Sequence, residues 1–498
     1  MSKKKKAGRY PCTDTGNAEL IAALFGDVLR YDHRQGRWLI WDRRRHRWSE
    51  DKAAEVRKFA IAAARHRRKI AARLTDTEKS KYEIKWAFES EDRHKLDAAL
   101  DIVKSLPPVS DYGDGWDANT WLLGVANGVI DLRTGKMREE QPDDRITKHS
   151  SVPFAPGARC PRFERFLKEI FNEDAAVVDY MRRVIGYFLT GSIQEQCVFC
   201  WYGSGANGKT TLDTVLRHIL GEYAVNLPFS ALEMKNRNCN DLVALSGCRL
   251  ATAAETNEGV RLNEARIKVL TGGDSITARR LYHEFFTFEP THKLVLAFNH
   301  KPIIADDSEG MWRRVRLVPF TRQFKQEEQD KHLPDALRAE ASGILAWAVR
   351  GCLLWQKEGL GMPPAVQQAT AAYRDESDHL GQFMHDCCIV EPGATVTSAA
   401  LWRRYQAWIT ESEEVPLSRQ TFAARLERRG FRRDRRGHDG TRMRVGIRLS
   451  GSEMQTLFGS TSDADTLTPA DTVSTNFPKR GDKESLQNPC QSASGVTQ

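Results

Sequence analysis

One segment in the middle of the chain has the residue types and spacing needed to hold phosphate groups. Residues 203–210 read GSGANGKT, after the apolar run VFCWY and before TLDTVLRHIL, which has helical periodicity. In the pattern GxxxxGK[ST], glycines let backbone N–H groups close around phosphate oxygens, the lysine faces the β and γ phosphates, and the hydroxyl reaches Mg²⁺. We therefore expect ATP and Mg²⁺ as cofactors. The predicted nucleotide contacts are Gly203, Ser204, Gly205, Ala206, Asn207, Gly208, Lys209, Thr210 and Thr211.

Such a loop needs an acid at the end of a neighbouring strand to hold the water shell of the metal and to orient the attacking water. The segment CRLATAAETNEG supplies Glu255 after a short apolar strand. We predict that Glu255 and Thr210 form the Mg²⁺ site. Glu255 departs from the common pair of adjacent acids because Ala254 precedes it, and we interpret Glu258 as a solvated loop charge.

Three further segments follow in a fixed order. Residues 263–288 read NEARIKVLTGGDSITARRLYHEFFTF, a strand in THKLVLAFNHKP ends at Asn299, and GMWRRVRLVPF places Arg313 and Arg314 before another strand. With the loop and the acid strand, this order resembles superfamily 3 helicases, specifically the phage and plasmid helicase-primase branch related to poxviral replication ATPases. The resemblance covers roughly residues 110–325.

The resemblance implies roles for these residues. Asn299 matches a sensor of the γ-phosphate or the attacking water, although the same asparagine could cap a turn before Lys301-Pro302. Either Arg313 or Arg314 matches an arginine finger that reaches the nucleotide of a neighbouring subunit. With Lys209 and Glu255, these residues complete the predicted catalytic set. A basic DNA-binding hairpin in the channel of the ring would carry Arg279, Arg280 and His283, with Lys268 near it.

The bulk composition fits a soluble chain with several domains and a polyanionic partner. The 498 residues carry a formal net charge of +9, with 40% hydrophobic and 28% charged residues. Length alone suggests roughly three domains at ~150 residues each. No apolar run reaches the ~20 residues of a membrane span, and the lysine-rich start lacks the apolar core of a secretory signal. We therefore expect a cytoplasmic protein that does not enter a membrane.

We predict an α/β fold in which a P-loop, AAA+-like parallel sheet forms the ATPase core. A basic, mainly helical region with a hairpin around Trp38, Ile40 and Trp48 precedes it, and a second hairpin is expected at 121–137. The segments ALWRRYQAWI, SRQTFAARLERRG and TRMRVGIRL indicate helix, helix and β-wing, as in a winged helix. Residues 419–448 hold eleven arginines against three acids, which suits phosphate contacts or an acidic partner. The expected domains are 1–110 (amino-terminal region), 111–325 (ATPase region, with the core from about 160), 326–377 (helical connector), 378–449 (winged-helix-like) and 450–498 (disordered tail).

The ten cysteines are expected to be reduced core residues. Cys197 and Cys200 have the CxxC spacing of a zinc or redox site, but no second Cys or His pair lies at a matching distance. Because CVFCWYG runs directly into the glycine-rich loop, we expect both sulfur atoms on a buried strand.

The function that unites these features is an ATP-dependent DNA helicase, a 3′-to-5′ hexameric ring acting on single-stranded or forked DNA of a phage, plasmid or integrated element. Polarity and hexamer follow from the resemblance alone. The alternative is an ATP-regulated replication initiator without processive unwinding. A DNA-packaging ATPase is disfavoured by the KVLTGGD segment. No convincing pair of metal-binding acids for primer synthesis is present, so a separate primase or initiator is an expected partner.

Overall fold

The computed structural model describes residues 10–234, 240–255, 257–279, 285–411, 416–436 and 441–450. The chain divides into two compact units, Met1–His379 and Leu380–Gln498. Within the described ranges, no helix combines the length and apolar character that crossing a bilayer requires. The expected disorder of the tail concerns residues that lie almost entirely outside the described ranges.

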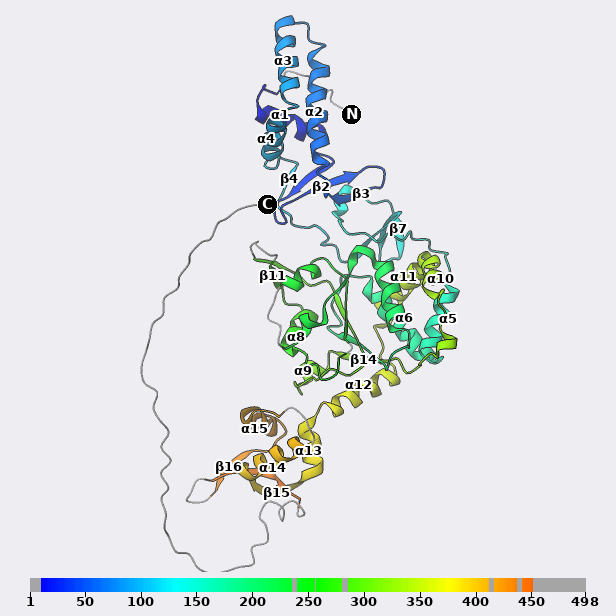
Figure 1. Ribbon diagram of the computed structural model, residues 1–498, viewed down its shortest axis with the longest axis vertical. Coiled ribbons are helices and arrows are strands. Elements are labelled where there is room, and N and C mark those ends of the chain that lie inside the picture. The colour runs from blue at the N-terminus through cyan, green and yellow to red at the C-terminus, as the bar shows by residue number, and fades with distance from the viewer. Residues whose placement is uncertain are drawn as a thin grey trace, which may run out of the picture. The chain divides into compact units, whose positions relative to one another are not determined.

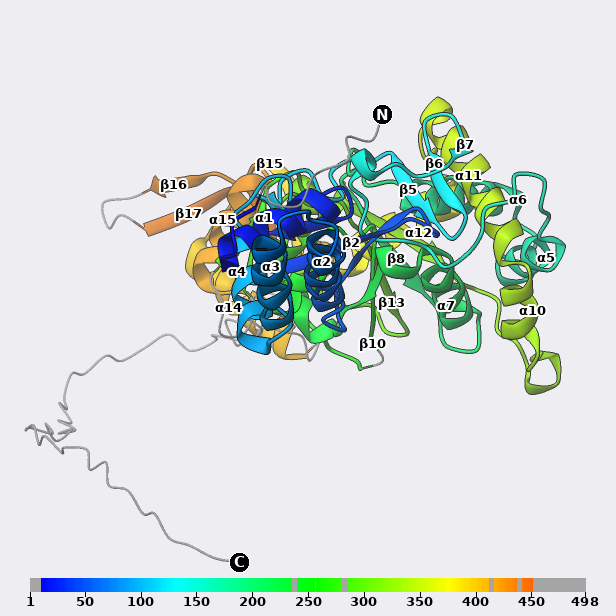
Figure 2. The same cartoon turned by 90° about the horizontal axis from the view of Figure 1, so that it is seen from above.

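The first unit begins with a helical region around a small sheet (Figure 1). Its order is α1 (Asp14–Phe25), β1 (Leu29–Asp32), β2 (Arg37–Asp42), β3 (Arg47–Glu50), α2 (Val56–Ala71), α3 (Thr77–Glu89), α4 (Arg93–Val103) and β4 (Ser110–Asp111). The strands lie in the order β3-β2-β1-β4, and β4 pairs parallel to β1. Helices α2 and α3 contact each other and run side by side (Figure 2).

The predicted hairpin in this region is present as β2 and β3, and β1 adds a third antiparallel strand. Leu39, Trp41 and Trp48 are buried, whereas Trp38 and Ile40 are half-buried. Side chains alternate between the two faces of a strand. Because Leu39 and Trp41 form the buried face of β2, Trp38 and Ile40 lie on its opposite face.

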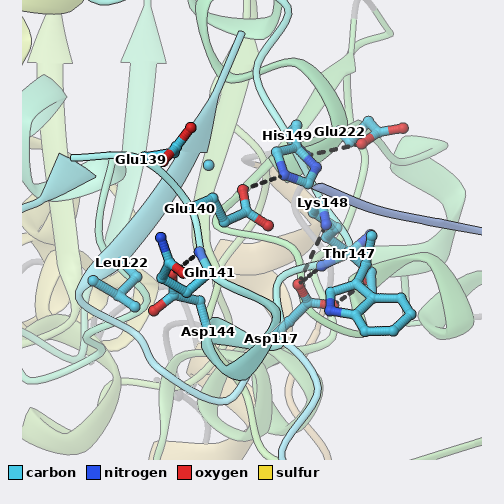
Figure 3. A network of polar contacts seen from close by, with 12 residues as sticks. Asp117, Leu122, Glu139, Glu140, Gln141, Asp144, Thr147, Lys148, His149 and Glu222 are labelled. Atoms are coloured by element: carbon cyan, nitrogen blue, oxygen red, sulfur yellow. Dashed lines mark hydrogen bonds and ion pairs between the residues drawn. The ribbon is translucent and has the colours of Figure 1, made fainter. Parts of the chain in front are cut away.

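A second, three-stranded antiparallel sheet follows, with the order β5 (Leu122–Val125), β6 (Gly128–Asp131) and β7 (Lys136–Arg138). Its first two strands form the hairpin predicted at 121–137, and Gly128 has a φ of 147°, which glycine adopts without strain. The 3₁₀ turn η1 (Pro142–Asp144) leads from this sheet to a network of polar contacts (Figure 3).

The centre of that network is a buried pair, His149 and Glu140, in which His149 Nε2–H donates to Glu140 Oε2 at 2.8 Å. Burial raises the pKa of Glu140, and the hydrogen bond from His149 opposes that rise. The backbone N–H of His149 donates to Glu222 Oε2 at 2.8 Å, so the pair joins this sheet to the turn after the central helix α7 (Lys209–Leu220) (Figure 3). Asp117 accepts from the backbone N–H of Thr147 at 2.7 Å and holds the same segment from the other side.

The core of the first unit is a parallel sheet of five strands in the order β14-β8-β13-β10-β9. The strands are β8 (Val198–Tyr202), β9 (Ala224–Asn226), β10 (Leu250–Glu255), β13 (Lys293–Phe298) and β14 (Val315–Pro319). A separate antiparallel hairpin, β11 (Ile276–Arg279) and β12 (Phe285–Phe288), lies between β10 and β13 in sequence. The short 3₁₀ turns are η2 (Gly221–Tyr223), η3 (Phe229–Leu232), η4 (Asn240–Leu245) and η5 (Gln326–Glu328).

Helices cover both faces of this sheet, as its nearly continuous apolar strands require. The helices are α5 (Pro161–Ile170), α6 (Ala175–Phe188), α7 (Lys209–Leu220), α8 (Glu264–Thr271), α9 (Glu309–Trp312), α10 (Leu333–Ala339), α11 (Ala341–Glu358) and α12 (Pro364–Glu376). Figure 1 shows α5, α6, α10 and α11 on one side of the sheet and α8 and α9 on the other. Phe199 and Trp201 of β8 pack into the first core, and Val198 and Cys200 pack into the second.

The two cysteines of the CxxC segment are both buried, as the sequence predicts, and belong to different cores. Burial raises the pKa of the Cys197 thiol to about 12 and also raises that of Cys200. Two thiols that face opposite sides of a strand cannot bind one metal ion together.

The second unit contains α13 (His379–Cys387), β15 (Cys388–Thr397), α14 (Ser398–Glu411), α15 (Arg419–Arg428), β16 (Arg433–Arg436) and β17 (Thr441–Leu449). The strands form an antiparallel sheet in the order β15-β17-β16. Its core is aromatic, with Phe383, Tyr405 and Phe422 in mutual contact. Arg425 and Arg444 are buried, so part of the arginine excess in this region is structural.

Removing the partner of Glu140 should destabilise the first unit strongly. We expect His149→Ala to lower the free energy of unfolding by about 3–5 kcal/mol, because it leaves a buried carboxylate without its partner. Replacing both His149 and Glu140 with alanine should cost less than the sum of the single variants. Urea unfolding followed by tryptophan fluorescence measures both effects. As a control, Lys58→Ala in the exposed pair with Glu55 should cost less than about 1 kcal/mol.

Candidate functional site

The glycine-rich loop connects β8 to α7, and α7 begins at Lys209. Gly208, the residue before the helix, has a φ of 86°, and α7 has no side-chain cap at its N-terminus. A Cβ at Gly203 would lie 2.3 Å from Asn207 Nδ2, and one at Gly208 would lie 2.5 Å from Ile170 Cγ2. The loop therefore depends on glycine at these two positions, and it presents the start of a helix, where N–H groups favour anions.

The ammonium of Lys209 is buried and folds back over the loop. Its Nζ donates to the Gly203 carbonyl at 2.5 Å and to Asn299 Oδ1 at 3.1 Å. Both acceptors are neutral, and burial lowers the pKa of Lys209 to about 8. An anion bound beside this ammonium would offset the cost of burying its charge.

The parallel register explains how Asn299 comes to meet Lys209. Tyr202 of β8 is paired with Phe298 of β13, and Phe298 is paired with Glu255 of β10. Gly203, Asn299 and Glu255 therefore lie at the same carboxyl edge of the sheet, where ligands of open α/β folds bind. The structure thus places the predicted loop, amide and acid together.

The acid of this edge is held by the backbone. Glu255 is half-buried, and its Oε1 accepts from the N–H of Asn257 at 2.8 Å. Glu258, interpreted from the sequence as a solvated charge, is exposed.

A cavity of about 200 Å³ extends from the start of α7 to α10. Thr211, Thr214, Val215 and His218 line it from α7, at the spacing i, i+3, i+4 and i+7 that defines one helical face. Leu337 belongs to the opposite wall, on α10. The sequence analysis did not predict this cavity. The spacing of its lining residues on α7 can be seen in the sequence, but the sequence does not show that α10 covers that face of α7.

Arg313 and Arg314 lie at the opposite edge of the sheet. They directly precede β14, whose first residue Val315 is paired with Val198 at the start of β8. The five residues of β8, at ~3.3 Å each, separate the two edges by roughly 15 Å. Neither arginine is therefore placed at the loop of its own chain.

The two arginines differ in their surroundings. Arg313 is exposed and donates from Nη2 to Gln196 Oε1 at 3.2 Å. Arg314 donates from Nη1 to the Gly310 carbonyl at 2.5 Å, and burial lowers its pKa. Arg313 is thus the residue whose guanidinium is available to a neighbouring molecule.

The predicted basic hairpin corresponds to β11 and β12. Arg279 lies at the end of β11, 5.0 Å from the ring centroid of Phe285, whose side chain is exposed. Arg280 and His283 lie outside the described residues. Lys268 lies on α8, before the hairpin, and its Nζ contacts Asp306 Oδ2 at 2.5 Å. Burial would raise the pKa of Asp306, but hydrogen bonds from Lys268 and Ser308 lower it.

Three segments of the chain match known family models. Residues 18–172 match the family "D5 N terminal like", residues 201–314 match a "Family of unknown function (DUF5906)", and residues 375–431 match "Poxvirus D5 protein-like". The chain carries D5-type domains. The resemblance to poxvirus-type replication proteins, drawn from the motifs, is confirmed.

Curated relatives of the chain come from viruses. They include "Putative helicase L207/L206" of Acanthamoeba polyphaga mimivirus, 30% identical over 54% of the chain and 31% of the relative. "Putative helicase 022R" of Frog virus 3 is 24% identical over 60% of the chain and 39% of the relative, and "Putative primase C962R" of African swine fever virus is 28% identical over 60% and 35%. The chain thus spans about a third of the length of the relatives it matches.

Among solved structures, the C-terminal region of NrS-1 aligns with 87% of the chain and 99% of that structure, at 9% identity and a TM-score of 0.48.

The buried ammonium of Lys209 should lower the stability of the ligand-free protein. Burial lowers the pKa of Lys209 from 10.5 to about 8, so the folded protein binds this proton more weakly than the unfolded chain. Below pH 8, the buried charge therefore lowers the free energy of unfolding by its full amount. This loss becomes smaller as the pH rises from 8 towards 10.5. We expect Lys209→Met to stabilise the ligand-free protein at pH 7 by about 1–3 kcal/mol, with a smaller gain at high pH.

Thermal unfolding at pH 7 and at pH 9.5 measures this difference. A gain that is equal at both pH values would contradict a lowered pKa of Lys209. Lys79→Met, at an exposed position, serves as the control for loss of a surface ammonium.

Proposed function

We propose that the chain is an ATP-driven DNA helicase of the superfamily 3 type, which works as a ring, most simply a 3′-to-5′ hexamer, on single-stranded or forked DNA. The proposal rests on two hydrogen bonds of Lys209, one to the Gly203 carbonyl of the loop and one to Asn299. Both lie at the edge of the sheet where β10 ends with Glu255. The names of the viral relatives, helicase and primase, support a role in replication.

The residues at the edge fit ATP and Mg²⁺. The loop would hold the phosphates through backbone N–H groups, and Lys209 would exchange its two neutral acceptors for phosphate oxygens. The hydroxyl of Thr210, which is exposed at the first turn of α7, and the carboxylate of Glu255 would hold Mg²⁺, which neutralises charge on the phosphates. Asn299 already contacts Lys209, so it is placed to respond when the lysine changes partners.

The cavity between α7 and α10 supplies a place for the nucleoside. It begins at Thr210 and Thr211, directly after the loop, and its walls include the apolar Val215, Pro334 and Leu337. A volume of about 200 Å³ and a mostly apolar wall suit a base and its sugar. The backbone N–H of Phe324 donates to the Ala206 carbonyl at 2.8 Å, which holds the segment before α10 against the loop.

Hydrolysis would require a neighbouring subunit. Arg313 is exposed at the amino edge of the sheet, away from the loop of its own chain. A head-to-tail ring brings the amino edge of one subunit to the carboxyl edge of the next, where a guanidinium stabilises charge on the transferring phosphoryl group.

DNA contacts are assigned to two regions. The hairpin of β11 and β12 would carry its basic residues, including Arg279, into the channel of the ring. The second unit, with helices α14 and α15 and the hairpin of β16 and β17, would act as a winged helix that grips phosphates. A separate primase or initiator remains the proposed partner for priming and loading.

The alternative function, an ATP-regulated initiator, is separated from the helicase by turnover and unwinding. We expect single-stranded DNA to stimulate ATP hydrolysis by the wild type, and Lys209→Ala to reduce turnover to background because the phosphates lose their cation. Phosphate release and displacement of one strand from a forked duplex are the measurements. DNA binding with no strand displacement would favour the initiator, and normal turnover by Lys209→Ala would remove the nucleotide assignment.

A subunit-mixing experiment tests the position of the active site. Arg313→Ala alone should reduce turnover roughly a thousandfold or more, as losses of arginine fingers do. An equimolar mixture of Arg313→Ala and Lys209→Ala subunits should recover activity, because roughly a quarter of randomly formed interfaces unite an intact lysine with an intact arginine. A mixture that stays inactive would place the arginine in its own subunit. Arg314→Ala, which removes the contact with Gly310, should lower thermal stability instead.

A further inference from the structure

Two residues of α8, Lys268 and Glu264, hold this helix to the segment between Asn299 and Arg313. Lys268 Nζ lies 2.5 Å from Asp306 Oδ2 and 3.2 Å from Ser308 Oγ. The buried carboxylate of Glu264, one turn earlier on α8, accepts from the backbone N–H of Ala305 at 2.7 Å.

At one end, α8 leads directly into the hairpin of β11 and β12. Ile267 and Leu270 of α8 share a buried core with Ile276 and Ala278 of β11. Because closely packed side chains transmit displacement, the helix and the base of the hairpin should move together.

At the other end, the fastened segment joins two residues assigned to hydrolysis. It starts at Asn299, which contacts Lys209, and Ser308 is the N-cap of α9, whose C-cap is Arg313. A Cβ on Gly310 would lie 4.0 Å from Lys268 Nζ, so the ammonium lies beside the first turn of α9.

We propose that the ion pair of Lys268 and Asp306 couples nucleic acid at the hairpin to the catalytic groups on the Asn299–Arg313 segment. Lys268 is thus a positioning residue and not a DNA contact. This inference rests on the proposed function and names the regulation of its active site. Both side chains are only about one-third exposed or less, with fractions of 34% and 26%, so solvent screens the attraction incompletely.

The test compares basal turnover, DNA-stimulated turnover and DNA affinity in the full-length chain. Asp306→Asn keeps an acceptor for the backbone N–H of Ser308 and leaves the Glu264 contact intact, so the protein should fold. We expect the ratio of stimulated to basal turnover to fall roughly three- to thirtyfold, with basal turnover and DNA affinity within about twofold of wild type. The reversed pair, Lys268→Glu with Asp306→Lys, should recover most of the ratio.

The matched control is Glu376→Gln. It removes the charge from the contact of Lys301 with α12, which holds the same segment but does not involve α8. It should leave the ratio unchanged. A normal ratio in Asp306→Asn, no recovery in the reversed pair, or an equal loss in Glu376→Gln would overturn the coupling.

Fluorescence anisotropy with single-stranded DNA provides a readout independent of turnover. If Lys268→Met weakens DNA binding while Asp306→Asn does not, Lys268 is a DNA contact and the proposal fails although the helicase assignment stands. If DNA does not stimulate the wild type at all, the proposed function fails and the coupling fails with it.

Discussion

The parallel pairing of β8 with β13 is the constraint on which the site depends. It aligns Tyr202 with Phe298, so the glycine-rich loop and Asn299 leave the sheet at the same level, and the ammonium of Lys209 can bond to both. A shift of one residue in this register would move the amide by ~3.3 Å and turn every side chain of β13 to the other face. Val295 packs into one core, and Leu294, Leu296 and Phe298 pack into the other, so the shift would exchange these sets and disrupt the packing of both cores. The two hydrophobic cores therefore also fix the geometry of the polar edge.

Two buried cations lie at the opposite edge of the sheet, where β10 and β13 begin. Arg249 and Lys293, at the starts of β10 and β13, are buried, and burial lowers the pKa of both. Arg249 donates to the Leu189 carbonyl at 2.5 Å, and Lys293 donates to the Thr190 carbonyl, both at the C-terminus of α6. Carbonyl groups at a helix C-terminus carry partial negative charge, which offsets the burial of the cations. Arg249 also donates to the Leu122 carbonyl, which attaches the second antiparallel sheet to the core.

The parts of the site that the sequence predicted are those encoded by local signals. The loop is a single continuous motif, and Glu255 and Asn299 each end an apolar strand, so a parallel sheet alone brings them to one edge. The contact of Lys268 with Asp306 joins residues 38 positions apart and follows from no local pattern. The buried face around Trp41 shows a second limit: in a strand with apolar residues at consecutive positions, alternation does not identify which set is buried.

The two edges of the parallel sheet are far apart and carry different charged groups. One edge holds a buried ammonium that donates to two neutral acceptors, and the other exposes the guanidinium of Arg313. Because the sheet between them is packed on both faces, a bend that brought the two together within one chain would disrupt both cores. Joining the edges of two chains requires no such deformation. In the proposed ring, the rigid sheet would keep the two edges apart within one chain. The Asn299–Arg313 segment, which runs between these edges, would then connect one subunit interface to the next.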